Sequence, residues 1–135
     1  MYRTILRLLP RSYGRLALLL LGSLGAALAI TYPALWFLAP LSLAALFRLL
    51  WTASSWKSAF FAAFVFGLAS GGAGVFWFWD TIPLDWMRVD PGKQWYFVLA
   101  SWGAVTLFFA LATAIVSLLI YFTRRMPAAA LLAAF

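Results

Sequence analysis

The side chains that could do chemistry in this sequence are three aspartates, Asp80, Asp85 and Asp90. A spacing of five does not place carboxylates on one face of a helix, and the neighbouring Pro83 and Pro91 indicate a loop. The sequence contains no His, Cys or Glu that could complete a metal site or supply a nucleophile or a general base. We therefore expect a solvated loop here, with no catalytic residue, no metal ligand and no cofactor.

Serine nucleophiles are the remaining possibility. Ser55, Ser58 and Ser70 have no base near them in the sequence, so a serine-based mechanism has no support. No charged residue lies in the middle of an apolar run, and the usual signature of a proton or ion pathway is therefore missing.

The composition indicates that membrane-spanning segments position these residues. Of the 135 residues, 67% are hydrophobic and 10% are charged, and the mean hydropathy is +1.00. A soluble domain is roughly half apolar and about one quarter charged, so the apolar surplus must face lipid. The net charge of +7 comes from short basic clusters beside apolar runs. That pattern favours membrane orientation and contact with anionic lipid headgroups over nucleic-acid binding.

The order of the apolar runs predicts an all-α fold, a polytopic transmembrane helical bundle with four complete spans plus the start of a fifth. A basic cytoplasmic segment, residues 1–15, precedes a transmembrane domain, residues 16–135. The expected spans are 16–31, 34–51, 58–79, 95–122 and a truncated 128–135. The last run is too short to cross a bilayer, so we expect a chain that is cut inside its fifth helix.

The first two runs raise alternatives. Run 16–31 reaches only about 24 Å, less than the roughly 30 Å of the hydrocarbon core, and could be a cleavable signal peptide. Its direct continuation through Tyr32-Pro33 into the second run favours a tight helical hairpin, which either spans or re-enters. Pro40 should kink the second helix.

The third run carries small residues at a spacing of four, and one link of this series is a GxxxG motif. Such a face lets another helix approach closely, because glycine removes the side chains that keep backbones apart. Packing within one chain is favoured over a homodimer interface. The predicted helix-packing residues are Ala59, Ala63, Gly67, Gly71 and Gly74.

The basic residues predict the orientation. By the positive-inside rule, the side with more Lys and Arg is cytoplasmic, so the amino terminus is expected inside and the loop 80–94 outside. The inner side would hold Arg3, Arg7, Arg11, Arg15, Arg48, Lys57, Arg124 and Arg125, and the outer side Arg88 and Lys93.

Several short motifs follow one another in a characteristic order through residues 14–123. They are Gly22 and Gly25 in a short first span, Tyr32-Pro33 followed by Trp36, Pro40-Leu41-Ser42-Leu43, Lys57-Ser58-Ala59, and the run from Phe66-Gly67 to Gly74-Val75-Phe76-Trp77. In this order and spacing, the chain resembles the amino-terminal transmembrane part of bacterial apolipoprotein N-acyltransferase.

The resemblance implies eight spans, an inner-membrane location with a cytoplasmic amino terminus, and a periplasmic nitrilase-like domain. That domain would carry a Glu-Lys-Cys triad, which moves an acyl chain from a phospholipid to the amino-terminal cysteine of an apolipoprotein. This chain has neither Cys nor Glu, so the triad cannot be carried over and these residues alone cannot run the reaction.

Three functions remain as hypotheses, and the third, a small transporter half, is weakened by the absence of intramembrane charge and of a visible inverted repeat. In the first, the chain anchors the missing domain and walls a lipid-filled cavity, with Trp77, Trp79 and Thr81 as cavity candidates; an ordinary aromatic belt is the alternative for these residues. The expected partners are membrane phospholipid and, in the complete enzyme, the apolipoprotein. The second hypothesis is a stand-alone assembly or structural subunit that packs through the small-residue face. The sequence does not predict the oligomeric state.

Overall fold

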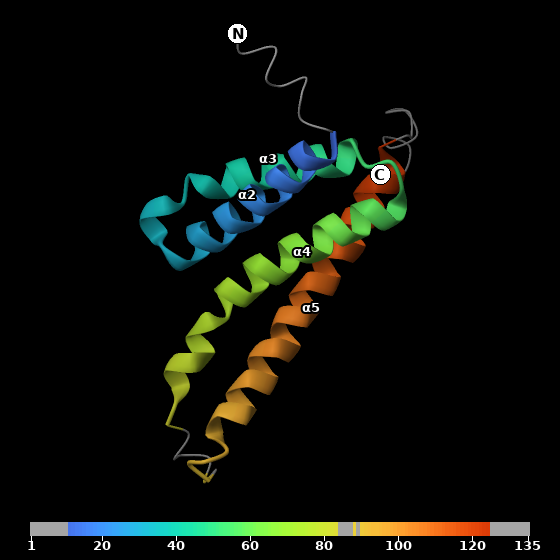
Figure 1. The fold of residues 1–135 in the computed structure, drawn as a ribbon. Helices are drawn as coiled ribbons and strands as arrows, with labels where there is room; N and C mark the ends of the chain where they lie inside the picture. Colours follow the sequence, from blue (N-terminus) through green and yellow to red (C-terminus); the bar gives the residue numbers. More distant parts are fainter. Residues whose placement is uncertain (1–10, 84–87, 89, 125–135) are drawn as a thin grey trace, which may run out of the picture.

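The chain folds into helices joined by short turns (Figure 1), and its computed structural model describes residues 11–83, 88 and 90–124. No strand occurs among these residues, which confirms the all-α prediction for this part of the chain. Three segments are long and apolar enough to cross a membrane, namely Tyr13–Thr31, Trp56–Thr81 and Gln94–Thr123. The elements are α2 (Arg11–Thr31), η1 (Pro33–Leu35), α3 (Leu38–Trp51), α4 (Trp56–Gly74), η2 (Phe76–Thr81) and α5 (Gln94–Thr123), where η marks a 3₁₀ helix.

Helices α2 and α3 lie side by side as a hairpin (Figure 1). The turn forms at Tyr32, whose backbone is extended, and Pro33 opens η1, where its fixed φ suits the first helical position. Ser42 of α3 is buried beside Gly25 of α2, and its hydroxyl donates to the carbonyl of Leu38 at 2.7 Å. The hairpin therefore buries a hydroxyl that already has an acceptor in its own helix.

Pro40 lies in the first turn of α3 rather than in its middle, so the expected kink is replaced by a helix start. Proline has no N–H for the carbonyl of Trp36, and that carbonyl accepts from the amide of Ala39 at 3.0 Å instead. Helix α3 ends at Trp51, as predicted. It has 14 residues, which at the α-helical rise extend about 21 Å, less than a hydrocarbon core.

Helix α4 begins two residues before the predicted run, because Ser55 caps its amino terminus and accepts from the amide of Ser58 at 3.3 Å. The α-helix ends at Gly74 and continues after Val75 as the 3₁₀ helix η2, whereas the sequence predicted one helix to residue 79. Glycine lowers helix propensity, and the segment 70–74 is glycine-rich. Helix α5 contains the whole predicted run 95–122.

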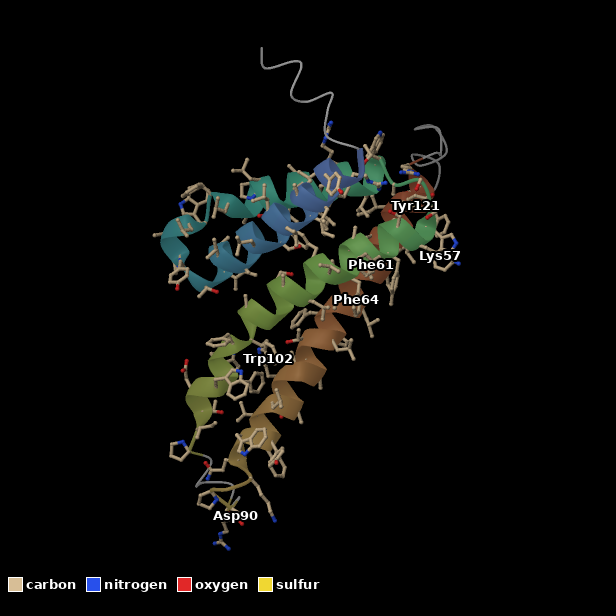
Figure 2. All side chains as sticks on the ribbon, in the orientation of Figure 1. Lys57, Phe61, Phe64, Asp90, Trp102 and Tyr121 are labelled. Carbon is tan, nitrogen blue, oxygen red and sulfur yellow. The ribbon has the colours of Figure 1, made fainter. Side chains whose placement is uncertain are left out.

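The core lies where all four helices meet. Leu50 of α3 is 1% exposed, and Ala59 and Ala63 of α4 and Ala114 of α5 are fully buried in one cluster. Many large apolar side chains point away from this cluster (Figure 2), and Leu21 is 69% exposed. Apolar surface of this extent suits a lipid environment rather than water.

The charged residues gather at opposite ends of the helices. Lys57 lies at one end of the molecule and Asp90 at the other (Figure 2). Arg15, Arg48 and Arg124 belong to the Lys57 end, since Arg15 contacts Ser58, Arg48 shares a hollow with Arg15, and Arg124 contacts the end of α3. The predictions that concern residues 1–10, Asp85, Arg125 and 128–135 lie outside the described residues.

Candidate functional site: an apolar hollow between α2, α4 and α5

The small-residue face of α4 lies against α5. A Cβ atom added at Gly67 would be 2.7 Å from the Cα of Ala110, and one added at Gly71 would be 2.8 Å from the Cβ of Phe109. Both distances are shorter than any real carbon contact, so only glycine permits this separation of the two backbones. The close approach positions the side chain of Phe109 beside the last turns of α4.

The end of α4 is held by a side chain of α5. The indole Nε1 of Trp102 donates to the carbonyl of Gly72 at 3.0 Å. Carbonyls in the last turn of a helix have no amide partner within that helix, so this bond satisfies a group that lipid cannot. Trp102 also packs against Gly72, where an added Cβ would be 3.3 Å from its ring.

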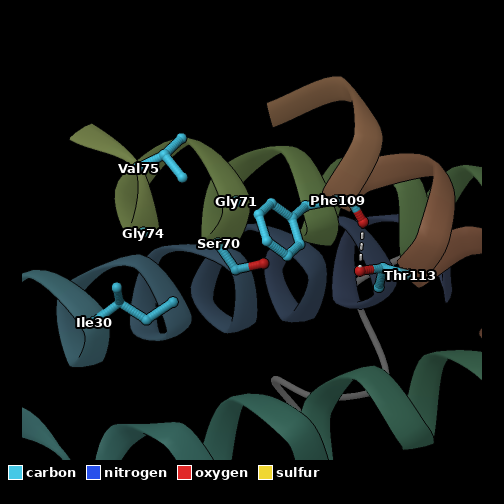
Figure 3. Close-up of a pocket in the computed structure, with 7 residues that line it drawn as sticks. All are labelled: Ile30, Ser70, Gly71, Gly74, Val75, Phe109 and Thr113. Carbon is cyan, nitrogen blue, oxygen red and sulfur yellow. Dashed lines mark hydrogen bonds between the residues drawn. The ribbon is translucent and has the colours of Figure 1, made fainter. Parts of the chain in front are cut away.

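A hollow of about 250 Å³ opens where these helices meet the end of α2 (Figure 3). Gly74 and Gly71 form part of its floor because they have no side chain to fill it. The nearest atom to a Cβ added at Gly74 is Cγ2 of Ile30, 3.7 Å away across the hollow. The hollow is lined by Ile30, Ser70, Gly71, Gly74, Val75, Phe109 and Thr113.

The two hydroxyl groups in the lining already donate hydrogen bonds within their own helices. Ser70 donates to the carbonyl of Phe66 at 2.9 Å, and Thr113 donates to the carbonyl of Phe109 at 2.8 Å, as the dashed line in Figure 3 marks. A hydroxyl that bonds back to its own helix presents mainly its carbon atoms to the outside. The hollow therefore offers an apolar surface, suited to a methylene chain. Its volume is below the roughly 300–1,000 Å³ of sites that hold a whole drug-sized ligand.

The predicted cavity residues lie beyond this hollow, in η2. Trp77 is 57% exposed and stacks on Phe78 with ring centroids 4.5 Å apart. Trp79 is half-buried, and its ring centroid lies 6.4 Å from that of Trp102. Thr81 donates to the carbonyl of Phe78 at 2.6 Å. Trp77, Trp79 and Thr81 thus lie in η2, outside the lining of the hollow.

Four of the five predicted helix-packing residues are buried, and one is not. Ala59, Ala63, Gly67 and Gly71 are buried, whereas Gly74 is exposed and lies opposite α2. Sequence reasoning missed Gly72, which is buried against Trp102, and it missed the α5 residues Phe109 and Thr113. The only sequence signal for Gly72 is the cluster of three glycines at 71, 72 and 74.

The loop between η2 and α5 has no arrangement suited to catalysis among the residues that the structure describes. Asp80 is exposed, and the Asp90 carboxylate accepts from the amide of Gly92 at 2.9 Å in a local turn. No group of three potential metal ligands lies together within the described ranges. Comparisons with protein-family models, curated proteins and solved structures found no match to this chain. The function is therefore inferred from the structure, in which the hollow between α2, α4 and α5 is suited to binding an apolar group.

Proposed function

We propose that this chain is the membrane-embedded part of an apolipoprotein N-acyltransferase-like protein of the bacterial inner membrane. In this proposal it anchors a catalytic domain and holds an acyl chain of a membrane phospholipid beside that domain. It takes no covalent part in phospholipid-to-lipoprotein acyl transfer, because it has no Cys, Glu or His.

The observation that carries the proposal is the apolar hollow on the α4–α5 pair. Its floor is backbone at Gly71 and Gly74, its walls are Ile30 and Phe109, and its hydroxyls are internally bonded. An acyl chain can enter such a hollow sideways from lipid without leaving a polar group unpaired. A volume of about 250 Å³ suits part of one chain, with the rest remaining in the bilayer.

The proposed topology has four spans and the start of a fifth, with the amino terminus in the cytoplasm. The separation of Arg15, Arg48 and Lys57 from the loop that holds Asp90 supports it, because cationic loops are retained inside. Helix α3 crosses together with η1 in this arrangement, since the 14-residue helix alone is short. The hollow then lies in the outer half of the bilayer, towards the side of the proposed catalytic domain.

The alternative, a stand-alone assembly subunit, would use the small-residue face of α4 against a second chain. Ala59 and Ala63 are fully buried within this chain, and Gly67 is in contact with α5. That face is therefore already covered, and the geometry favours the lipid-binding proposal.

Photolabelling in vesicles tests the proposal. The chain is reconstituted with a phosphatidylcholine that carries a photoreactive group on its acyl chain, and the labelled residues are mapped by mass spectrometry. We expect labelling to concentrate on residues 70–75 and 109–113. Gly74→Phe fills the hollow and should reduce that labelling several-fold, whereas the control Leu21→Phe, on an outward position of α2, should leave it unchanged. If all exposed apolar residues are labelled to the same extent, the hollow is not a specific site.

A second test addresses the acyltransferase assignment itself. The coding sequence beyond Phe135 is read for a nitrilase-like domain with a Glu-Lys-Cys triad, and Trp77→Ala is assayed in that complete protein. Lower lipoprotein acylation supports a cavity role for Trp77, whereas unchanged acylation removes it. A stable, monodisperse protein that ends at Phe135 in its natural gene supports the assembly alternative.

A further inference from the structure

A second, more polar hollow lies at the other end of the helices, where α2 begins and α3 ends. Its volume is about 740 Å³, three times that of the apolar hollow. Arg15 and Arg48 line it from the two helices of the hairpin together with Leu18, and Ser54 lines it from the α3–α4 turn. Two arginines therefore face one space that is large enough for a phosphorylated headgroup.

Neither arginine has an acidic partner among the residues that the structure describes. The only acidic residues of the sequence are Asp80, Asp85 and Asp90. Asp90 lies at the opposite end of the molecule (Figure 2), and no ion pair involves Arg15 or Arg48 within residues 11–83, 88 and 90–124. The positive charge of this hollow is therefore not neutralised by the described part of the chain.

Two further cations whose side chains are described at this end, Arg124 and Lys57, are engaged differently. Arg124 donates to three backbone carbonyls, and Lys57 lies over the ring of Trp56 at 5.8 Å. Arg15 donates only to the neutral hydroxyl of Ser58, at 3.3 Å, and the guanidinium of Arg48 has no hydrogen-bond partner among the described residues. Arg15 and Arg48 thus keep most of their donors available, and guanidinium groups match phosphate oxygens bidentately.

The α3–α4 turn contributes two further hydroxyl groups to the lining, those of Thr52 and Ser54. Ser54 lies two residues before α4, whose amino-terminal end carries the positive end of the helix dipole. Thr52 contributes no donor, because its hydroxyl already donates to the carbonyl of Arg48 at 2.8 Å.

We propose that this hollow binds the phosphate group of an anionic ligand through Arg15 and Arg48, with Ser54 as a further donor. The source of the phosphate is either an anionic phospholipid headgroup or a soluble phosphate ester. The position at the end of apolar helices places the hollow at headgroup level, where basic residues attract anionic lipid. The site is independent of the proposed acyl-chain hollow, which lies near the opposite end of α4.

The test uses the whole chain in nanodiscs of neutral phosphatidylcholine. Phosphatidylglycerol is added in increasing proportion, and bound lipid is counted by native mass spectrometry together with the thermal unfolding midpoint. The variants are Arg48→Gln, Arg15→Gln and the double variant. Lys57→Gln is the matched control, because it removes one positive charge at the same end outside the hollow. Circular dichroism verifies that each variant is folded, and Arg48→Gln breaks no described hydrogen bond of the side chain.

We expect each arginine variant to weaken phosphatidylglycerol binding about fivefold, the double variant about twenty-fivefold, and Lys57→Gln less than about twofold. Arg48→Lys should give an intermediate loss, because it keeps the charge and loses the bidentate geometry. Glycerol 1-phosphate added to neutral nanodiscs separates the two sources. Binding of this ester in neutral nanodiscs identifies a soluble phosphate as a ligand, whereas binding of phosphatidylglycerol without binding of the ester identifies the headgroup. An equal loss in Lys57→Gln, or no binding of either probe to the unchanged chain, overturns the proposal.

Discussion

The guanidinium of Arg124, at the end of α5, donates to the carbonyl of Leu50, at the end of α3, over a distance of 2.5 Å. The same side chain donates to the carbonyls of Trp51 at 2.7 Å and Ala53 at 3.0 Å, and it lies over the ring of Tyr121 at 4.0 Å. One cation thereby binds three carbonyls at the end of helix α3 and in its turn, where the negative end of the helix dipole lies. Arg124 joins the hairpin to the α4–α5 pair.

Replacement of this arginine should loosen that connection. We expect Arg124→Gln to lower the free energy of unfolding by about 1–3 kcal/mol, because charged hydrogen bonds to three carbonyls are lost and the side chain is only partly exposed. Arg124→Lys should recover part of the loss. The measurement is reversible denaturation in detergent micelles. Lys57→Gln removes a charge of the same sign without a hydrogen bond, and an equal effect in that control would contradict the capping role.

The spacing between α4 and α5 gives a second prediction. At Gly67 an added Cβ meets the backbone of Ala110, which cannot rotate away, so Gly67→Ala should destabilise the fold by about 1–3 kcal/mol through overpacking. Gly103 is the matched control on α5, since nothing lies within 4 Å of a Cβ added there. Gly103→Ala should stabilise the protein by about 0.5–1 kcal/mol, because alanine favours the helix. Thermal unfolding of both variants tests the pair, and similar destabilisation in both would refute close packing at Gly67.

A third prediction concerns the end of α4. Trp102→Phe keeps an aromatic ring against Gly72 and removes the indole donor to its carbonyl, so the last turn of α4 should fray. We expect a loss of about 1 kcal/mol in stability and faster amide hydrogen exchange over residues 72–76. Trp95→Phe, at an exposed tryptophan stacked on Tyr96, is the control and should leave exchange in that segment unchanged.

Periodicity and hydropathy predicted the long elements well because helix existence depends on local composition. The first run ends at Thr31 as expected, the second at Trp51, and run 95–122 falls within α5. The bounds differ where a single backbone group decides them. Pro40 lies in the first turn of a helix instead of kinking one, and the glycines before Val75 end α4 early.

The candidate sites depend on contacts between distant residues, which one sequence does not reveal. Spacing alone placed Gly67 and Gly71 on one face, but it could not identify Ala110 and Phe109 as their neighbours. Arg124 was expected only to flank a span, since its three acceptors lie more than seventy positions away in the sequence. The predicted roles of Trp77, Trp79 and Thr81 remain predictions.

Thr106 of α5 has a buried hydroxyl without a partner in the described part of the chain. Thr106 is 6% exposed, and its Oγ1 makes no hydrogen bond among the described residues, although it lies between the α4 glycines and Trp102. Thr106→Val keeps the shape and removes an unsatisfied polar group, so we expect a stability gain of up to about 1 kcal/mol. Thr113→Val is the control, because that hydroxyl already donates to the carbonyl of Phe109 and its removal should bring no gain. Unfolding of the two variants in the same micelles decides the point. A clear loss for Thr106→Val would mean that the hydroxyl has a partner in the membrane, such as a bound water, and that the unsatisfied state assigned to it is wrong.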